Sequence, residues 1–306
     1  MAGGLTQEAP TKPRGLAVWL LASRPKTLSV TLSPVLLGTA FAISDSAFHG
    51  LAFVCALVSG LLIQIGTNFA NDYEDYVRGA DTEFRKGPTR VTQSGMVSPQ
   101  AVKRAAIITF SLAVAAGGYL IFRGGWPILV LGLVSIASGI AYTAGRYALA
   151  YTGLADLFVL AFFGPIAVGG TYYVQALTLP SYVLIAGIGP GLIAVGTLIV
   201  NNVRDINEDR AANKRTLIVR FGRRFGELYY VTCYVIAAVI PVYLISRMDG
   251  PYLSLVASAV ALIFGVALAG KLRKSEDPAV LNALLGKTAM VLLVYSVAWG
   301  AGWIVG

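Results

Sequence analysis

The sequence predicts an all-α membrane protein with about nine transmembrane helices arranged around a central cavity. Its mean hydropathy is +0.71, and only 13% of its 306 residues are charged, whereas soluble domains typically carry about 25% charged residues. Apolar runs long enough to cross a bilayer recur along the chain, and the Lys and Arg residues gather in alternate connections between them. These features predict a multi-pass integral membrane protein rather than a soluble domain with an anchor.

Nine apolar runs account for most of the chain. Each has about 17–22 residues, which is the length that a helix needs to cross the hydrocarbon core. In order, they cover residues 24–43, 51–70, 104–122, 126–144, 154–174, 182–201, 229–246, 252–270 and 284–305. Glycine and proline occur inside several runs, as at Gly164-Pro165, and membrane helices tolerate both residues. We expect residues 1–14 to form a disordered tail and residues 15–306 to form one transmembrane domain.

The distribution of basic residues predicts the orientation of the helices. All Lys and Arg residues except Arg123 and Arg247 lie at the N-terminus or near the second, fourth, sixth and eighth connections. Because cytoplasmic loops carry the excess of Lys and Arg, we expect the N-terminus on the cytoplasmic side of the cell (inner) membrane. The net charge of +9 then reflects orientation and anionic ligands, and we expect no nucleic-acid partner.

Two clusters of Asn, Asp and Glu interrupt this apolar pattern, each directly after a predicted membrane helix. The first cluster contains Asn68, Asn71, Asp72, Asp75 and Asp81. The second cluster contains Asn201, Asn202, Asp205, Glu208 and Asp209. Within each cluster the polar residues recur at helical spacing, so each set is expected on one face of a helix that continues out of the membrane. Four helices apart, the two sets are expected to face each other across the cavity.

Basic residues follow both clusters, in the loops 71–103 and 202–227. The ones that we select as candidate ligands of an anion are Arg85, Lys86, Arg90, Lys214 and Arg215. Carboxylates supply oxygen ligands for Mg²⁺, and Lys or Arg side chains bind phosphate oxygens. Because the rest of the bundle is apolar, the combination predicts a site for a lipid diphosphate with bound Mg²⁺.

Two other interpretations compete with this one. Carboxylates beside Arg at helix ends can be solvated ion pairs that contribute little energy, although that explains two matched clusters poorly. A transporter could also carry intramembrane acids and paired halves. In a transporter the acids should lie near the middle of the membrane, whereas here they emerge with basic loops at one side.

The two acidic clusters resemble motifs of the UbiA superfamily of intramembrane prenyltransferases. They read Asn71-Asp72-Tyr73-Glu74-Asp75 and Asp205-Ile206-Asn207-Glu208-Asp209. The resemblance runs nearly from end to end, and it implies a UbiA-like helix bundle. Within the superfamily, residues 71–95, 162–175 and 201–222 are most similar to the 1,4-dihydroxy-2-naphthoate polyprenyltransferases of menaquinone biosynthesis.

This resemblance implies a Mg²⁺-dependent reaction. A polyprenyl group would pass from polyprenyl diphosphate to 1,4-dihydroxy-2-naphthoate, with loss of CO₂ and diphosphate, to give demethylmenaquinol. Oxidation of this product, separate from the transfer, gives demethylmenaquinone. The implied metal ligands and catalytic carboxylates are Asp72, Asp75, Asp205 and Asp209.

The other implied site residues contact the substrates. Asn68, Asn71 and Asn202 would orient the diphosphate or a metal-bound water, and the selected Arg and Lys residues would neutralise the charge of the diphosphate. Asp81 and Glu208 would assist the metal ligands. Tyr142, at the cytoplasmic end of the fourth predicted helix, is our preferred aromatic residue for stabilising positive charge.

Several questions stay open at the level of sequence. One alternative function is prenyl transfer by the same mechanism to a different acceptor, such as 4-hydroxybenzoate or homogentisate. Asp156 lies where many relatives are expected to carry glutamate, so a role for this carboxylate is open. The prenyl chain length, the contacts to the acceptor, the general base and the oligomeric state are not given by the sequence.

Overall fold

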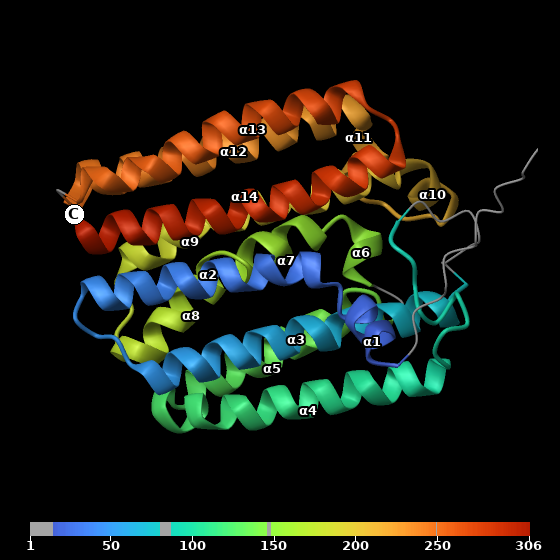
Figure 1. Ribbon diagram of the computed structural model, residues 1–306, viewed down its shortest axis with the longest axis horizontal. Coiled ribbons are helices and arrows are strands. Elements are labelled where there is room, and N and C mark those ends of the chain that lie inside the picture. The colour runs from blue at the N-terminus through green and yellow to red at the C-terminus, as the bar shows by residue number, and fades with distance from the viewer. Residues whose placement is uncertain (1–14, 80–86, 146–147, 249) are drawn as a thin grey trace, which may run out of the picture.

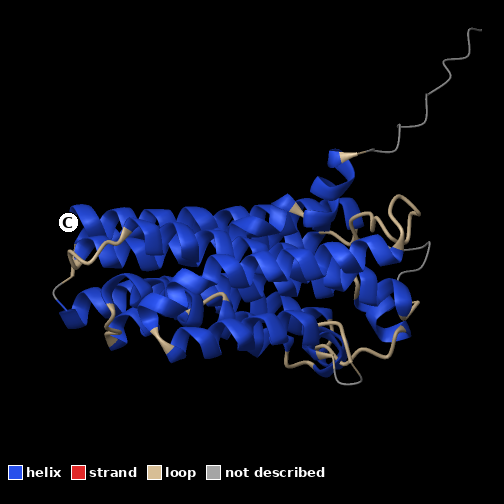
Figure 2. Cartoon of the chain, turned by 90° about the horizontal axis from the view of Figure 1, so that it is seen from below, coloured by secondary structure: helices blue, strands red, loops and turns tan. Residues whose placement is uncertain are grey.

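The computed structural model describes residues 15–79, 87–145, 148–248 and 250–306. Within these ranges the regular elements are helices (Figure 2). In order, they are α1 (Leu16–Ser23), α2 (Pro25–Ser44), α3 (Gly50–Val77), α4 (Pro99–Gly124), α5 (Trp126–Ala141), α6 (Leu149–Thr152), α7 (Ala155–Phe162), α8 (Pro165–Ala176), α9 (Ser181–Arg204), α10 (Ile206–Ala211), α11 (Leu217–Phe221), α12 (Arg223–Met248), the 3₁₀ turn η1 (Tyr252–Ser254), α13 (Leu255–Lys274) and α14 (Pro278–Val305). The tail predicted for residues 1–14 lies outside the described residues.

The long helices lie side by side along the longest axis of the molecule (Figure 1). The short helices α1, α6 and α10 gather at one end of this bundle, and the C-terminus lies at the other. The prediction of an all-helical membrane bundle is therefore confirmed. Because loops and short helices are concentrated at one end, that end is where polar side chains from distant segments meet.

Each of the nine predicted apolar runs is helical. Within the described ranges, eight helical segments are long and apolar enough to cross a membrane, by length and composition alone. The fourth run forms α5, which is apolar but has only 16 residues. The exact number of membrane crossings and the side of the N-terminus remain predictions.

The fifth run is divided into α7 and α8 at Gly164, and α9 packs closely against this division. A Cβ atom on Gly187 of α9 would lie 2.6 Å from Cα of Pro165. Proline interrupts the helix because it lacks an N–H group and collides with the preceding turn. Glycine on the facing helix lets the two backbones approach, as small residues do at membrane helix interfaces.

The largest core cluster lies mainly between α9, α12 and α14. It includes the buried rings of Tyr230, Tyr234, Tyr295 and Trp299. The Tyr230 hydroxyl lies 3.0 Å from the Thr288 hydroxyl, and the Tyr295 hydroxyl donates a hydrogen bond of 2.7 Å to the carbonyl of Ala237. Buried tyrosines usually need such a partner. This packing fixes α9, which carries the second acidic cluster at its end.

Replacing Gly187 by alanine should destabilise the protein by about 1–3 kcal/mol, because the added methyl group overpacks the contact with Pro165. The matched change Gly118→Ala should be neutral or slightly stabilising, since no heavy atom lies within 4 Å of a Cβ at Gly118 and alanine favours a helix. Thermal unfolding of the detergent-purified variants checks this. Equal midpoints for the two variants would contradict the role assigned to Gly187.

Candidate functional site

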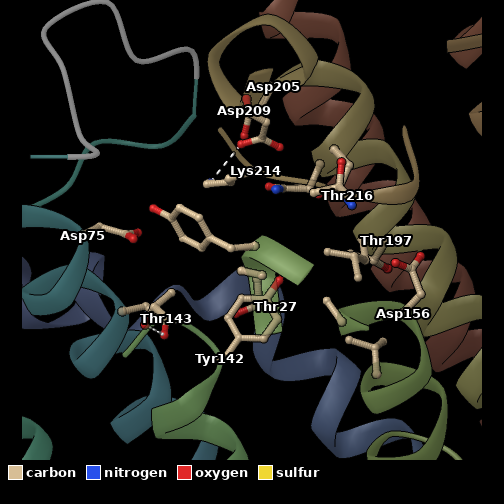
Figure 3. A pocket seen from close by; sticks show the side chains of 18 of the residues that line it. Thr27, Asp75, Tyr142, Thr143, Asp156, Thr197, Asp205, Asp209, Lys214 and Thr216 are labelled. Carbon is tan, nitrogen blue, oxygen red and sulfur yellow. Dashed lines mark hydrogen bonds and ion pairs between the residues drawn. The ribbon is translucent and has the colours of Figure 1, made fainter. Parts of the chain in front are cut away.

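A polar cavity of about 490 Å³ lies where the two acidic clusters meet. Figure 3 shows Asp75 from α3 on one side and Asp205 and Asp209 on another. The sequence-predicted residues that line it are Asn71, Asp75, Arg90, Tyr142, Asn202, Asp205, Glu208, Asp209 and Lys214. Segments more than 120 residues apart in the chain therefore contribute to one site, as the sequence predicts.

An apolar cavity of about 430 Å³ adjoins the polar one. Side chains such as Leu120, Phe158 and Phe162 line it, and Asn71 and Tyr142 line both cavities. Tyr142 directly follows α5, so its ring lies where the polar and apolar spaces join. A ligand with a charged head and a long apolar chain has a matching surface for each part.

The first acidic cluster lies on the last turns of α3, which is one continuous helix through Val77. Asn71 and Asp75 are four residues apart and therefore share a face. The Asp75 carboxylate accepts a bond of 2.5 Å from the Arg90 guanidinium. The amide oxygen of Asn71 accepts a bond of 2.6 Å from the Thr143 hydroxyl. Both residues present oxygen atoms at the wall of the cavity.

Asp72 and Asn68 are buried, but they hold neighbouring backbone instead of lining the polar cavity. The Asp72 carboxylate accepts hydrogen bonds of 3.2 Å from the backbone N–H groups of Val91 and Thr92. The Asn68 amide donates a bond of 2.9 Å to the carbonyl of Ser23. The structure therefore uses Asp72 to anchor the turn that carries Arg90 towards Asp75.

The prediction that the second cluster continues one helix is wrong, because the helix is interrupted at Asp205. This residue has φ −98° and ψ 13° and separates α9 from α10. The Arg204 guanidinium donates bonds of 2.7 Å and 2.6 Å to the two oxygens of Asp205. Adjacent side chains do not face each other on a regular helix, so the interruption permits this pair.

Arg204 does not line the cavity, but it holds residues that do, and it was not selected from the sequence. Besides Asp205, it donates a bond of 2.8 Å to the amide oxygen of Asn201 and one of 2.6 Å to that of Asn282. It is buried, with only 1% of its side chain exposed. Its position at the end of an apolar run could have identified it, because an Arg buried there needs carboxylate or amide partners.

Asp209 and Lys214 form an ion pair of 2.8 Å at the opposite wall. Burial raises the pKa of Asp209 above its usual value, although the nearby ammonium acts in the other direction. For Lys214, burial acts to lower the pKa, but the attraction of Asp209 outweighs it and the net shift is upward. The Lys214 ammonium also lies 5.3 Å from the centre of the Tyr151 ring. A cation is thus held at the cavity edge.

The remaining predicted residues are not brought to this cavity or lie outside the described residues. Arg215 does not line either cavity, and its backbone N–H donates to the carbonyl of Tyr151 at 3.0 Å. Asp81, Arg85 and Lys86 lie outside the described residues. Arg24, which lines both cavities at the start of α2, was not selected from the sequence.

The donor set of the cavity fits a hard divalent cation. Asp75, Asp205 and Asp209 supply carboxylates, and Asn71 and Asn202 supply amide oxygens, which are the ligand types that Mg²⁺ prefers. Among the described residues, no three acidic, His or Cys side chains already converge as a metal site. Each of the three carboxylates has a cationic partner.

Comparisons with known proteins agree with this geometry. The UbiA prenyltransferase family matches residues 31–287. The 1,4-dihydroxy-2-naphthoate octaprenyltransferase of Haemophilus influenzae is 33% identical, covering 95% of this chain and 97% of that protein. The protein of the same name from Escherichia coli is 35% identical, covering 93% and 94%. The structure of a UbiA homologue from Archaeoglobus fulgidus bound to GPP and Mg²⁺ shares the fold, with a TM-score of 0.67 at 18% identity and coverage of 94% and 99%.

The Asp72→Ala variant should exchange the amide hydrogens of Val91 and Thr92 at least about tenfold faster, because a hydrogen bond to a charged group contributes about 1.5–3 kcal/mol. Hydrogen-exchange mass spectrometry of peptides from residues 88–97 measures this effect. Glu74→Ala is the matched control on the same helix turn. Unchanged exchange in the Asp72 variant would show that this carboxylate does not anchor the turn.

Proposed function

The chain belongs to the UbiA prenyltransferase family, and on that premise we propose that it transfers a polyprenyl group from polyprenyl diphosphate to 1,4-dihydroxy-2-naphthoate. The reaction releases CO₂ and diphosphate and belongs to menaquinone biosynthesis. The names of the bacterial relatives support this acceptor. The observation that carries the proposal is the meeting of both acidic clusters and three cations, Arg24, Arg90 and Lys214, in one polar cavity beside an apolar one.

In this proposal Asp75, Asp205 and Asp209 would hold Mg²⁺, with Asn71 and Asn202 as neutral oxygen donors. Bound Mg²⁺ supplies Lewis-acid stabilisation of the leaving diphosphate. Each carboxylate already stands beside a cation. Mg²⁺ could therefore replace these cations at the carboxylates, and the cations that line the cavity could then contact diphosphate oxygens.

Three other members of the predicted set have less direct roles. Asp72, also a predicted metal ligand, would first have to reach the cavity, because it anchors the turn at Val91 and Thr92 in this structure. Glu208 lines the cavity and would assist the carboxylates that bind the metal. Asn68 would orient α1 and α2 through its bond to Ser23.

The cations stabilise the charge that develops on the diphosphate as the bond to the prenyl chain breaks. Arg90 and Lys214 line the cavity and would turn from their carboxylates to phosphate oxygens, which both side chains bind well. Arg85, Lys86 and Arg215 are further candidates from the same loops. Charge stabilisation of this kind is often the largest single contribution to catalysis.

The apolar cavity accommodates the prenyl chain and excludes water from the allylic carbon. Exclusion of water protects a reactive cation from hydrolysis. Tyr142 lies at the junction of the two cavities, where its ring face can stabilise positive charge on that carbon. The acceptor ring then attacks the first carbon of the chain from within the polar cavity.

The protein is a multi-pass membrane enzyme, and we place it in the cell (inner) membrane with this site on the cytoplasmic side. The placement rests on the excess of Lys and Arg in the loops at the site end. Among the described residues of those loops are Arg78, Arg90, Lys214 and Arg215, whereas Arg123 lies at the other end of α4.

Prenyl transfer by purified protein tests the proposal. Wild type with 1,4-dihydroxy-2-naphthoate, polyprenyl diphosphate and Mg²⁺ should form a prenylated, decarboxylated product, with no turnover in excess chelator and recovery on adding Mg²⁺. Lys214→Met should lower kcat by about 100-fold or more, since it removes a preorganised charge from the transition state. Arg210→Gln is the matched control, because this nearby exposed cation does not line the cavity.

If product forms with 4-hydroxybenzoate but not with the naphthoate, prenyl transfer is supported and the proposed acceptor is wrong. Equal losses in the Lys214 and Arg210 variants would indicate a general charge effect instead of a contact with the diphosphate.

A further inference from the structure

Asp156 is a buried carboxylate that the roles assigned above do not use. It lies in the first turn of α7 with 6% of its surface exposed, and it lines the polar cavity. Its Oδ2 atom has no hydrogen-bond partner among the described residues. Burying a charged oxygen without a partner is costly, so a ligand in the cavity is the group that could donate a hydrogen bond to it.

The surroundings of Asp156 differ from those of the other carboxylates in the cavity. Asp75, Asp205 and Asp209 each pair with an Arg or Lys side chain, whereas no ion pair joins Asp156 to another described residue. Figure 3 shows Asp156 beside Thr197 of α9 and well apart from the side chains of Asp75, Asp205 and Asp209.

The neighbouring Thr197 does not satisfy this carboxylate. The Thr197 hydroxyl is also buried without a hydrogen-bond partner among the described residues. Apolar side chains, among them Val159, Phe163 and Leu198, line the same cavity. The Oδ2 atom of Asp156 is therefore a hydrogen-bond acceptor without a partner among the described residues, at a wall that also carries apolar side chains and apart from the three paired carboxylates (Figure 3).

The chemistry of the two substrates decides which one fits, and this step rests on the proposed function. A prenyl diphosphate carries acceptor oxygens and hydrocarbon, and it offers no hydroxyl donor to a carboxylate. The carboxylate of the acceptor would be repelled by Asp156. The ring hydroxyls of the acceptor are the remaining donors, and a hydrogen bond to a charged oxygen is stronger than one between neutral groups.

We infer that the Asp156 carboxylate accepts a hydrogen bond from a ring hydroxyl of the aromatic acceptor and so selects a hydroxylated ring. The bond orients the ring between Asp156 and the diphosphate end of the cavity. It also increases electron density on the ring oxygen, which favours attack by the ring carbon. A site built to bind a hydroxyl rejects analogues without it strongly, because the buried acceptor is then left unpaired.

Steady-state kinetics of Asp156→Ala in the full-length protein test this contact. The KM for 1,4-dihydroxy-2-naphthoate should rise at least about tenfold, which corresponds to loss of a hydrogen bond to a charged group. The KM for polyprenyl diphosphate should stay within about twofold, because the carboxylate does not touch that substrate. Asp45→Asn is the control for loss of a carboxylate. Asp45 follows the C-terminal end of α2, whereas the N-terminal end of α2 borders the cavity, so this variant should leave both KM values unchanged.

Two monohydroxy analogues identify the contact itself. The inhibition constants of 1-hydroxy-2-naphthoate and 4-hydroxy-2-naphthoate are measured with wild type and Asp156→Ala. The analogue that lacks the contacted hydroxyl should bind both proteins equally, and the other should lose affinity as the full acceptor does. This pattern is the coupling expected of two groups in direct contact, and a general distortion of the cavity would not produce it.

The outcomes separate this inference from the proposed function. If wild type prenylates the naphthoate and Asp156→Ala leaves the KM for the acceptor unchanged, the inference about Asp156 is overturned and the proposed function stands. Equal loss of affinity for both analogues, or a matching rise in the KM for polyprenyl diphosphate, also overturns it. Absence of naphthoate product from folded wild type overturns both.

Discussion

Three ion pairs at one end of the helix bundle determine how the site is built. Arg90 binds Asp75, Arg204 binds Asp205 and Lys214 binds Asp209, and each pair is largely removed from solvent. An unpaired carboxylate there would carry a large desolvation cost. The pairs therefore allow three carboxylates to lie around one cavity without its ligands. They also place cations beside the position where a diphosphate would bind.

The apolar bundle supplies the rigidity that these pairs require. The hydrogen bond from Tyr295 to the carbonyl of Ala237 joins α14 to α12, and the buried tyrosines of these two helices pack closely against Gly189 and Gly196 of α9. Close contact at Gly187 keeps α9 against the division between α7 and α8. Consequently the end of α9, with Asp205, and the start of α7, with Asp156, have fixed positions at the two sides of the cavity. Preorganised polar groups in an excluded site are what charge stabilisation needs.

The sequence was sufficient to predict the helices and the meeting of the two acidic clusters, because both follow from periodicity and hydropathy. It did not reveal the partner of each carboxylate. Helical spacing put Asp72 with Asp75, yet Asp72 turned to the backbone of Val91 and Thr92. The interruption at Asp205 was missed because it depends on Arg204 reaching its own neighbour, a contact that a regular helix forbids. The isolation of Asp156 depends on how α7 and α9 pack, which spacing does not encode.

The central claim is that α3 and the segment after α9 hold one metal–diphosphate unit together. A structure of the protein with Mn²⁺ and an unreactive prenyl thiolodiphosphate tests this most directly, because anomalous scattering locates the metal. The account predicts Mn²⁺ bound to carboxylate oxygens from both segments, Asp75 on one side and Asp205 or Asp209 on the other, with Arg90 and Lys214 on the diphosphate. A bound diphosphate whose metal contacts only one segment, with the opposite ion pair intact, would contradict it.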